Sequence, residues 1–133
     1  MSRLFIAALL TVATAAGASF LSSPAAAGED VLSSGRFQGL NGHATEGSVV
    51  IKKTDGGAVA VLEEDFSFDG APDPKLGFGK DGTYDRASTI THLNQVNGHQ
   101  VIEIPSGVDV SGYNEFYVWC ERYKVPLGVA KLK

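Results

Sequence analysis

Hydrophobic and polar residues alternate with a period of two over much of the chain after residue 27, which is typical of β-strands with one buried face. In residues 47–53, Val49 and Ile51 fall on the same face of such a strand. An Asp-Gly-Gly sequence follows at 55–57, and glycine tolerates the positive φ that a tight hairpin turn requires. Residues 58–64 then alternate again. The sequence therefore predicts a β-hairpin here.

The rest of the chain continues in the same way, and no segment shows the period of a long helix. Glycine or proline interrupts the alternation roughly every eight to twelve residues, a spacing typical of all-β domains. Further strands are expected around residues 76–78, 89–93, 99–104, 115–120 and 127–132, with loops at 69–74 and 80–88 and turns at 97–98 and 112–114. These elements predict an all-β fold, a single small antiparallel β-sandwich or flattened barrel.

The first 27 residues have a different character. Arg3 precedes an apolar run over residues 4–18, and small residues follow up to Ala27. This order is typical of a secretory signal peptide, and the run is shorter than the roughly 20 residues that a membrane-spanning helix needs. We expect cleavage after Ala27, with Ala18 as the alternative site. The prediction is a signal peptide over 1–27 and one soluble domain over 28–133, periplasmic or secreted, with no membrane span after cleavage.

Composition excludes several classes of function. The formal net charge is −4 and the basic residues are not clustered, which disfavours a nucleic-acid partner or an anionic membrane surface. The only methionine is Met1, so the chain after the signal peptide has no thioether to offer a metal or a haem. No G-x-S-x-G elbow, paired-carboxylate site or nucleotide-binding loop is present. Catalytic turnover is therefore not predicted.

Cys120 is the only cysteine, which is unusual in an exported chain because cysteines there generally pair. Such a residue is a buried small hydrophobe, half of an intermolecular disulfide, or a reactive or ligating thiol. In a strand over 115–120, Phe116 and Val118 share its face, which favours burial. The same alternation places Arg122 on this face, and arginine is seldom buried unpaired. We therefore expect Cys120 at the rim of the core, partly open to water, where a thiol is more reactive.

The histidines are the natural partners for a ligating thiol. His43, His92 and His99 are the three in the chain, and none has the spacing of a local chelate. A copper or zinc site would have to combine Cys120 with histidines from separate strands, while each histidine also fits a surface or hydrogen-bonded role. A C-x-x-C-H motif is absent, so covalent haem attachment is excluded and non-covalent haem stays open. The acidic segments at 63–73 and 81–85 do not match a calcium-binding EF-hand loop.

Several blocks, taken in order, resemble the DM-thirteen (electron-transfer DM) domain family. They lie at residues 35–37, 42–51, 62–66, 70–73, 98–105, 113, 118–120 and 125–130. The resemblance implies a small extracytoplasmic β domain in which Cys120 matches a nearly invariant cysteine. The suggested roles of that cysteine are a naked redox thiol or a ligand to a bound group such as haem. His43 matches a histidine common in the family and is the candidate second ligand.

Two functions follow as expectations. The first is an exported cell-envelope domain with a redox or electron-transfer accessory role through Cys120, either as a naked thiol or as a ligand to haem or copper. Its electron partner would be a separate redox or cell-envelope protein. The alternative is a non-catalytic extracytoplasmic interaction module in which Cys120 is structural.

Overall fold

A computed structural model describes residue 17 and residues 30–133 of the chain. The predicted signal peptide and the cleavage site after Ala27 lie outside the described residues, apart from Gly17. Among the residues that the structure describes, no helix is long and apolar enough to span a membrane.

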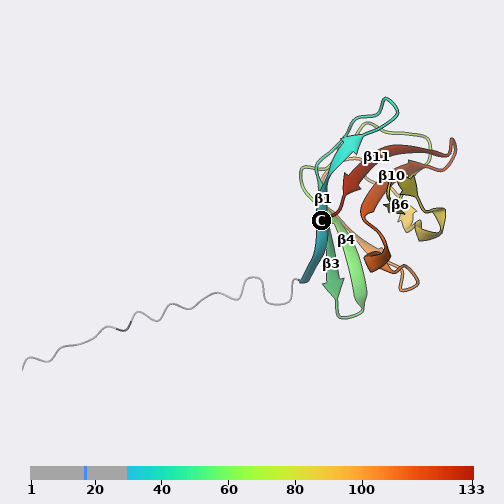
Figure 1. Ribbon diagram of the computed structural model, residues 1–133. Coiled ribbons are helices and arrows are strands. Elements are labelled where there is room, and N and C mark those ends of the chain that lie inside the picture. Colours follow the sequence, from blue (N-terminus) through green and yellow to red (C-terminus); the bar gives the residue numbers. More distant parts are fainter. Residues whose placement is uncertain (1–16, 18–29) are drawn as a thin grey trace, which may run out of the picture.

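The described residues form strands and two short 3₁₀ helices (Figure 1). The strands are β1 (Asp30–Gly39), β2 (Thr45–Glu46), β3 (Ser48–Thr54), β4 (Gly57–Leu62), β5 (Ser67–Phe68), β6 (Pro74–Lys80), β7 (Thr83–Tyr84), β8 (Thr91–His92), β9 (Gln100–Ile104), β10 (Glu115–Cys120) and β11 (Val125–Lys131). The 3₁₀ helices are η1 (Arg86–Ser88) and η2 (Val110–Gly112). The predicted all-β class is confirmed.

Nine of the strands form one antiparallel sheet in the order β7-β6-β10-β11-β1-β3-β4-β9, with β8 paired to β6. Strands β2 and β5 form a separate pair. The large sheet curls on itself into a half-barrel, which agrees with the expected flattened barrel (Figure 1).

Strand β1 joins the two halves of the curled sheet. Its first part, from Asp30 to Arg36, pairs with β3, and its last part, from Phe37 to Gly39, pairs with β11. The sequence did not predict this strand, because much of it is exposed and polar and Phe37 is its only buried residue. One long strand therefore connects the β3–β4–β9 half with the half that carries Cys120.

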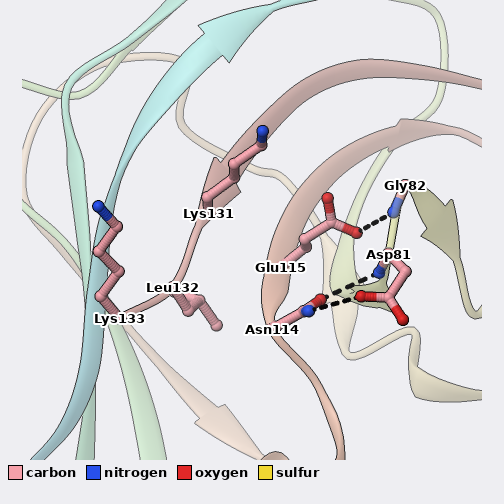
Figure 2. A pocket seen from close by; sticks show the side chains of 7 residues that line it. All are labelled: Asp81, Gly82, Asn114, Glu115, Lys131, Leu132 and Lys133. Carbon is pink, nitrogen blue, oxygen red and sulfur yellow. Dashed lines mark hydrogen bonds between the residues drawn. The ribbon is translucent and has the colours of Figure 1, made fainter.

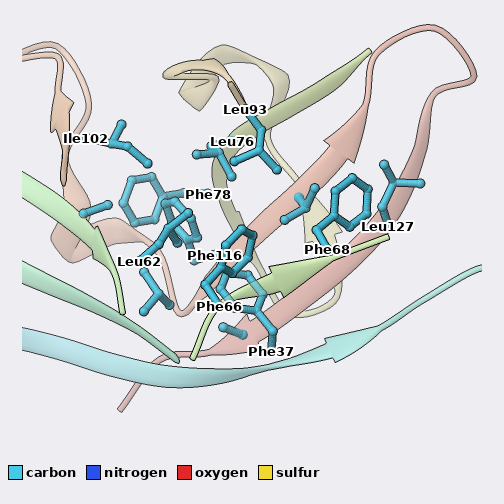
Figure 3. Close-up of a cluster of buried hydrophobic side chains, with 14 of the residues drawn as sticks. Phe37, Leu62, Phe66, Phe68, Leu76, Phe78, Leu93, Ile102, Phe116 and Leu127 are labelled. Carbon is cyan, nitrogen blue, oxygen red and sulfur yellow. The ribbon is translucent and has the colours of Figure 1, made fainter. Parts of the chain in front are cut away.

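Aromatic side chains fill the space inside the curl (Figure 3). Phe78 meets Phe116 edge-on with ring centroids 5.1 Å apart, and Phe37 meets Phe66 in the same manner at 5.3 Å. Such edge-to-face pairs are favourable beyond the area that they bury. Phe37 also meets Phe116 edge-on at 6.2 Å, so the core links β1 to β10 and, through Phe78, to β6.

The expected elements compare well with the observed ones. The β3–β4 hairpin is confirmed, with Thr54 opposite Gly57, and β10 has the predicted bounds. The expected loop over 80–88 is only partly a loop, since it contains β7 and η1. Each of these two elements has only two or three residues, too few for a period to show in the sequence.

Candidate functional site

Cys120 is the last residue of β10, and its side chain is part of the hydrophobic core. Phe116 and Val118 share its inward face, as the alternation predicts. The residue is 1% exposed and its thiol is free. The prediction of a partly water-exposed thiol at the rim is therefore wrong. The strand ends at Cys120, and in the following turn the guanidinium of Arg122 lies over the ring of Tyr123, 5.5 Å from its centroid.

The backbone around Cys120 is irregular. The β10–β11 register shifts between Val118 and Trp119, which marks a β-bulge. Pro126 lies opposite Trp119, and Pro74 lies opposite Cys120, so each strand that flanks this end of β10 lacks one backbone donor. Such features are typical of the less stable ends of sheets, where local opening costs less than global unfolding.

Glu121, the residue after Cys120, holds the β10–β11 turn in place on the outer face of the sheet. We call Arg86, Trp119, Glu121 and Lys124 the Glu121 cluster. The Glu121 carboxylate accepts from Lys124 Nζ at 2.8 Å, from Trp119 Nε1 at 3.1 Å and from Arg86. Lys124 Nζ also donates to the Glu121 carbonyl at 3.0 Å. The cluster thus connects the end of β10 to the β10–β11 turn and to η1.

Charge and hydrogen bonding keep Glu121 ionised. The hydrogen bond from Lys124, followed by that from Arg86, lowers the pKa of Glu121 from 4.5 to about 2. Sequence reasoning placed Glu121 opposite Cys120 but missed the cluster. Arg86 lies far from Glu121 in the sequence, and only the pairing of β6 with β10 brings η1 close to this turn.

An aromatic stack continues this outer face. Tyr84 stacks on Trp119 with ring centroids 4.5 Å apart and meets Tyr117 edge-on at 5.6 Å. Gly77 leaves the space for it, since a Cβ there would lie 2.5 Å from the Tyr84 hydroxyl. Burial, helped by the nearby charge of Glu115, raises the pKa of Tyr117 to about 12. The stack fixes the ring of Trp119, the residue before Cys120, on the outer face of the sheet.

His43, the predicted second ligand, has partners of its own. Its Nδ1 lies 2.9 Å from Asp69 Oδ1, and its ring stacks on Phe68 with centroids 5.9 Å apart. The other Asp69 oxygen accepts from the Ala44 N–H at 3.0 Å. This backbone hydrogen bond, followed by the one with His43, lowers the pKa of Asp69. The geometry thus joins His43 to a carboxylate in the loop after β5.

The residues around Cys120 do not fit a haem or copper centre. The thiol is packed in the core and 1% exposed, so it leaves no open position for a bound group. Over residues 30–133, no three His, Cys, Asp or Glu side chains are grouped so that they could hold a metal ion. His92 instead lies 3.5 Å from Asp73, measured from Nδ1 to Oδ1, and His99 is exposed.

Comparison with known proteins gives a family. No curated protein and no solved structure matches the chain. The model of the family described as electron transfer DM13 matches residues 36–132, from the middle of β1 to the end of the described sheet. This match confirms the resemblance seen in the sequence and points to a role related to electron transfer. The chain belongs to the electron transfer DM13 family.

Proposed function

We propose that the chain is an exported redox accessory domain of the cell envelope in which Cys120 is a protected thiol. In this proposal the thiol reacts only when the end of β10 and the β10–β11 turn open locally. The observation that carries the proposal is the position of Cys120, buried in the core but immediately next to Glu121, whose side-chain contacts close the turn. The family match supports the redox part of the proposal.

Burial decides what the closed state can do. A thiol reacts as its thiolate, and a charge is costly in an apolar core. Cys120 is 1% exposed among apolar side chains, so the closed state protects it from oxidants and from other thiols. Reaction therefore requires exposure to water, where the thiol can lose its proton.

The turn provides the means of exposure. Residues 122–124 are exposed, and Lys124 has a φ of +57°, a conformation that is costly for residues other than glycine. Opposing this cost, the Glu121 carboxylate and carbonyl both bind Lys124 Nζ. Opening the turn breaks these contacts, the Arg86 ion pair and two backbone hydrogen bonds, while the rest of the sheet stays paired. The Lys124 N–H donates one of these bonds to the Cys120 carbonyl at 2.8 Å, and the Glu121 N–H donates the other to the Asp73 carbonyl at 3.0 Å.

The chemistry after opening is thiol–disulfide exchange with a separate partner that carries a disulfide. The Cys120 thiolate attacks one partner sulfur, a mixed disulfide forms, and the partner's S–S bond breaks. The electron pair of that bond leaves on the second partner sulfur, which takes up a proton. Cys120 is thereby oxidised and the partner sulfur is reduced.

The degree of burial also favours a second function. A cysteine that is 1% exposed in a close-packed core is typical of a structural residue. In that case the domain is a non-catalytic extracytoplasmic interaction module. The two functions differ in whether the Cys120 thiol ever becomes exposed to solvent while the protein is folded.

The test is exchange between the folded protein and an aromatic disulfide that releases a coloured thiol. We expect one equivalent of coloured thiol, released without denaturant, and a mixed disulfide at Cys120 in the mass spectrum. Cys120→Ser is the control and releases none. If release begins only where the protein unfolds globally, the redox proposal fails and the interaction module stands. Export is tested separately by the mass of the periplasmic product, which should begin at residue 28.

A further inference from the structure

The large sheet has β9 at one edge and the short strands β7 and β8 at the other. Strands β7 and β8 have only two residues each, and the turn before β7 is held to the start of β10. Asn114 Oδ1 accepts from the Asp81 N–H at 3.0 Å. Glu115 Oε1 accepts from the Gly82 N–H at 2.7 Å (Figure 2). Such short, fixed edge strands give another chain little to pair with.

Strand β9 is a regular edge strand without this protection. Its register with β4 is unbroken from Gln100 to Ile104, and it contains neither proline nor glycine. Within residues 30–133 it pairs with β4 alone. A groove of about 410 Å³ lies beside it, between β9 and side chains of the segment 90–95. An edge of this kind is a template for pairing with a further strand.

The backbone groups that β9 directs to its open edge follow from the alternation of hydrogen bonds in the sheet. The Glu63 N–H donates to the Ser48 carbonyl at 2.9 Å, at the end of the β3–β4 pair. Hydrogen-bonded pairs alternate along antiparallel strands, so residues 59 and 61 of β4 bond to β3, whereas residues 58, 60 and 62 bond to β9. Their partners in β9 are residues 104, 102 and 100. The N–H and C=O groups of Val101 and Glu103 therefore point to the open edge.

A row of valines leads to this edge on the outer face of the sheet. Val50 lies opposite Val61, and Val61 lies opposite Val101. We call these three residues the valine row. Val61 is 5% exposed, whereas Val101 at the edge is 56% exposed. The row therefore ends in an apolar side chain that a further strand would cover.

We propose that β9 pairs with β9 of a second copy of the chain, in an antiparallel dimer centred on Val101. In this register the two Val101 residues lie opposite each other and join the valine rows of the two copies. His99 of each copy lies opposite Glu103 of the other. Both side chains are exposed, and within residues 30–133 neither has a hydrogen-bond or ion-pair partner. The inference does not depend on the chemistry of Cys120.

Side-chain chemistry selects this register over its neighbours. A dimer centred on Ile102 places Val101 opposite Glu103, and a dimer centred on Glu103 places two carboxylates opposite each other, which is unfavourable. Of these three registers, only the one centred on Val101 pairs an imidazole with a carboxylate and an apolar side chain with an apolar side chain. The strand supplies both halves of the match, which is why we assign the edge to a second copy. The two-fold dimer is also closed, since it leaves no free β9 edge for a third copy.

The test is sedimentation equilibrium of the folded protein at concentrations up to about 1 mM, with a reductant present so that no disulfide through Cys120 contributes. We expect a reversible monomer–dimer equilibrium. Val101→Lys should weaken the association by about tenfold or more, because it places two like charges opposite each other. Glu103→Lys should weaken it by roughly threefold or more, since both cross-strand pairs with His99 are lost.

A charge swap tests the register itself. The double variant His99→Glu/Glu103→Lys again places opposite charges across the dimer and should restore the wild-type affinity to within about threefold. Thr83→Lys is the matched control, an exposed substitution at the β7 edge that should leave the association unchanged. The proposal is overturned if the protein stays monomeric throughout, whether or not it binds a strand of another protein. It is also overturned if folded Val101→Lys associates like wild type, or if the swap associates no better than Glu103→Lys.

Discussion

Cys120 and Glu121 are adjacent at the end of β10 but belong to opposite faces of the sheet. The Cys120 thiol lies in the core and the residue is 1% exposed, whereas the Glu121 carboxylate accepts from Lys124, Arg86 and Trp119 on the outer face. A change that frees Glu121 therefore acts on the backbone that covers Cys120. Under the proposed local opening, this relationship connects the electrostatics of the turn to access to the thiol.

The first prediction concerns acid stability. The pKa of Glu121 is lowered from 4.5 to about 2 in the folded chain, so its ionised form is favoured by folding. Its stabilising contribution is complete above pH 4.5 and is lost as the pH falls toward 2. The urea midpoint should decline over this range, and the Glu121→Gln midpoint should decline less. Equal slopes for the two proteins would contradict the assignment. Added salt should weaken the difference, since the cluster is near the surface.

The second prediction concerns the packing of Cys120. Cys120→Ala should lower the free energy of unfolding by about 1–3 kcal/mol, because it removes a buried side chain. Cys120→Ser should lower it further, since a hydroxyl in this apolar core has a desolvation cost of roughly 1–3 kcal/mol if it finds no acceptor. Urea unfolding measures both. The exposed Ser106→Ala is the control and should stay within about 0.5 kcal/mol. A neutral Cys120→Ser would mean that the thiol site is open to water.

The third prediction concerns Gly47, which accepts the Phe37 N–H where β1 changes from one neighbouring strand to the other. Its φ is +95°, and a Cβ there would lie 2.5 Å from the Asp65 carbonyl oxygen. Gly47→Ala should therefore destabilise the fold by about 2 kcal/mol or more. Gly56 lies in the β3–β4 turn, where a Cβ meets nothing within 4 Å. Gly56→Ala should change stability by less than about 1 kcal/mol. Similar thermal midpoints for the two variants would contradict the steric argument.

Much of the fold can be predicted from the sequence, because a strand with strong alternation of apolar and polar residues can be recognised without knowing its tertiary neighbours. Val49 and Ile51 predict β3, and Phe116 and Val118 predict β10, since each set must face the core. Strand β1 is different. Its pairing depends on two neighbours at once, and its exposed polar residues have no strand pattern of their own.

The site could be predicted only in part. The face on which Cys120 lies followed from alternation, but its exposure depends on where the chain turns after β10. Extending the alternation to Arg122 was the error, because the strand ends two residues earlier. The contact between Arg86 and Glu121 is set by tertiary structure alone.

Local opening at Cys120 is tested by its labelling rate with a thiol reagent, measured in native buffer and in low concentrations of urea and compared between wild type and Glu121→Gln. If the turn opens locally, labelling should be faster than global unfolding allows, should respond only weakly to urea, and should accelerate by about tenfold or more in Glu121→Gln. Asp109→Asn is the matched control, because it removes another carboxylate with a lowered pKa, at the start of η2. It should leave the native labelling rate unchanged. If labelling instead follows the global free energy of unfolding in all three proteins, Cys120 is a structural core residue and the account is wrong.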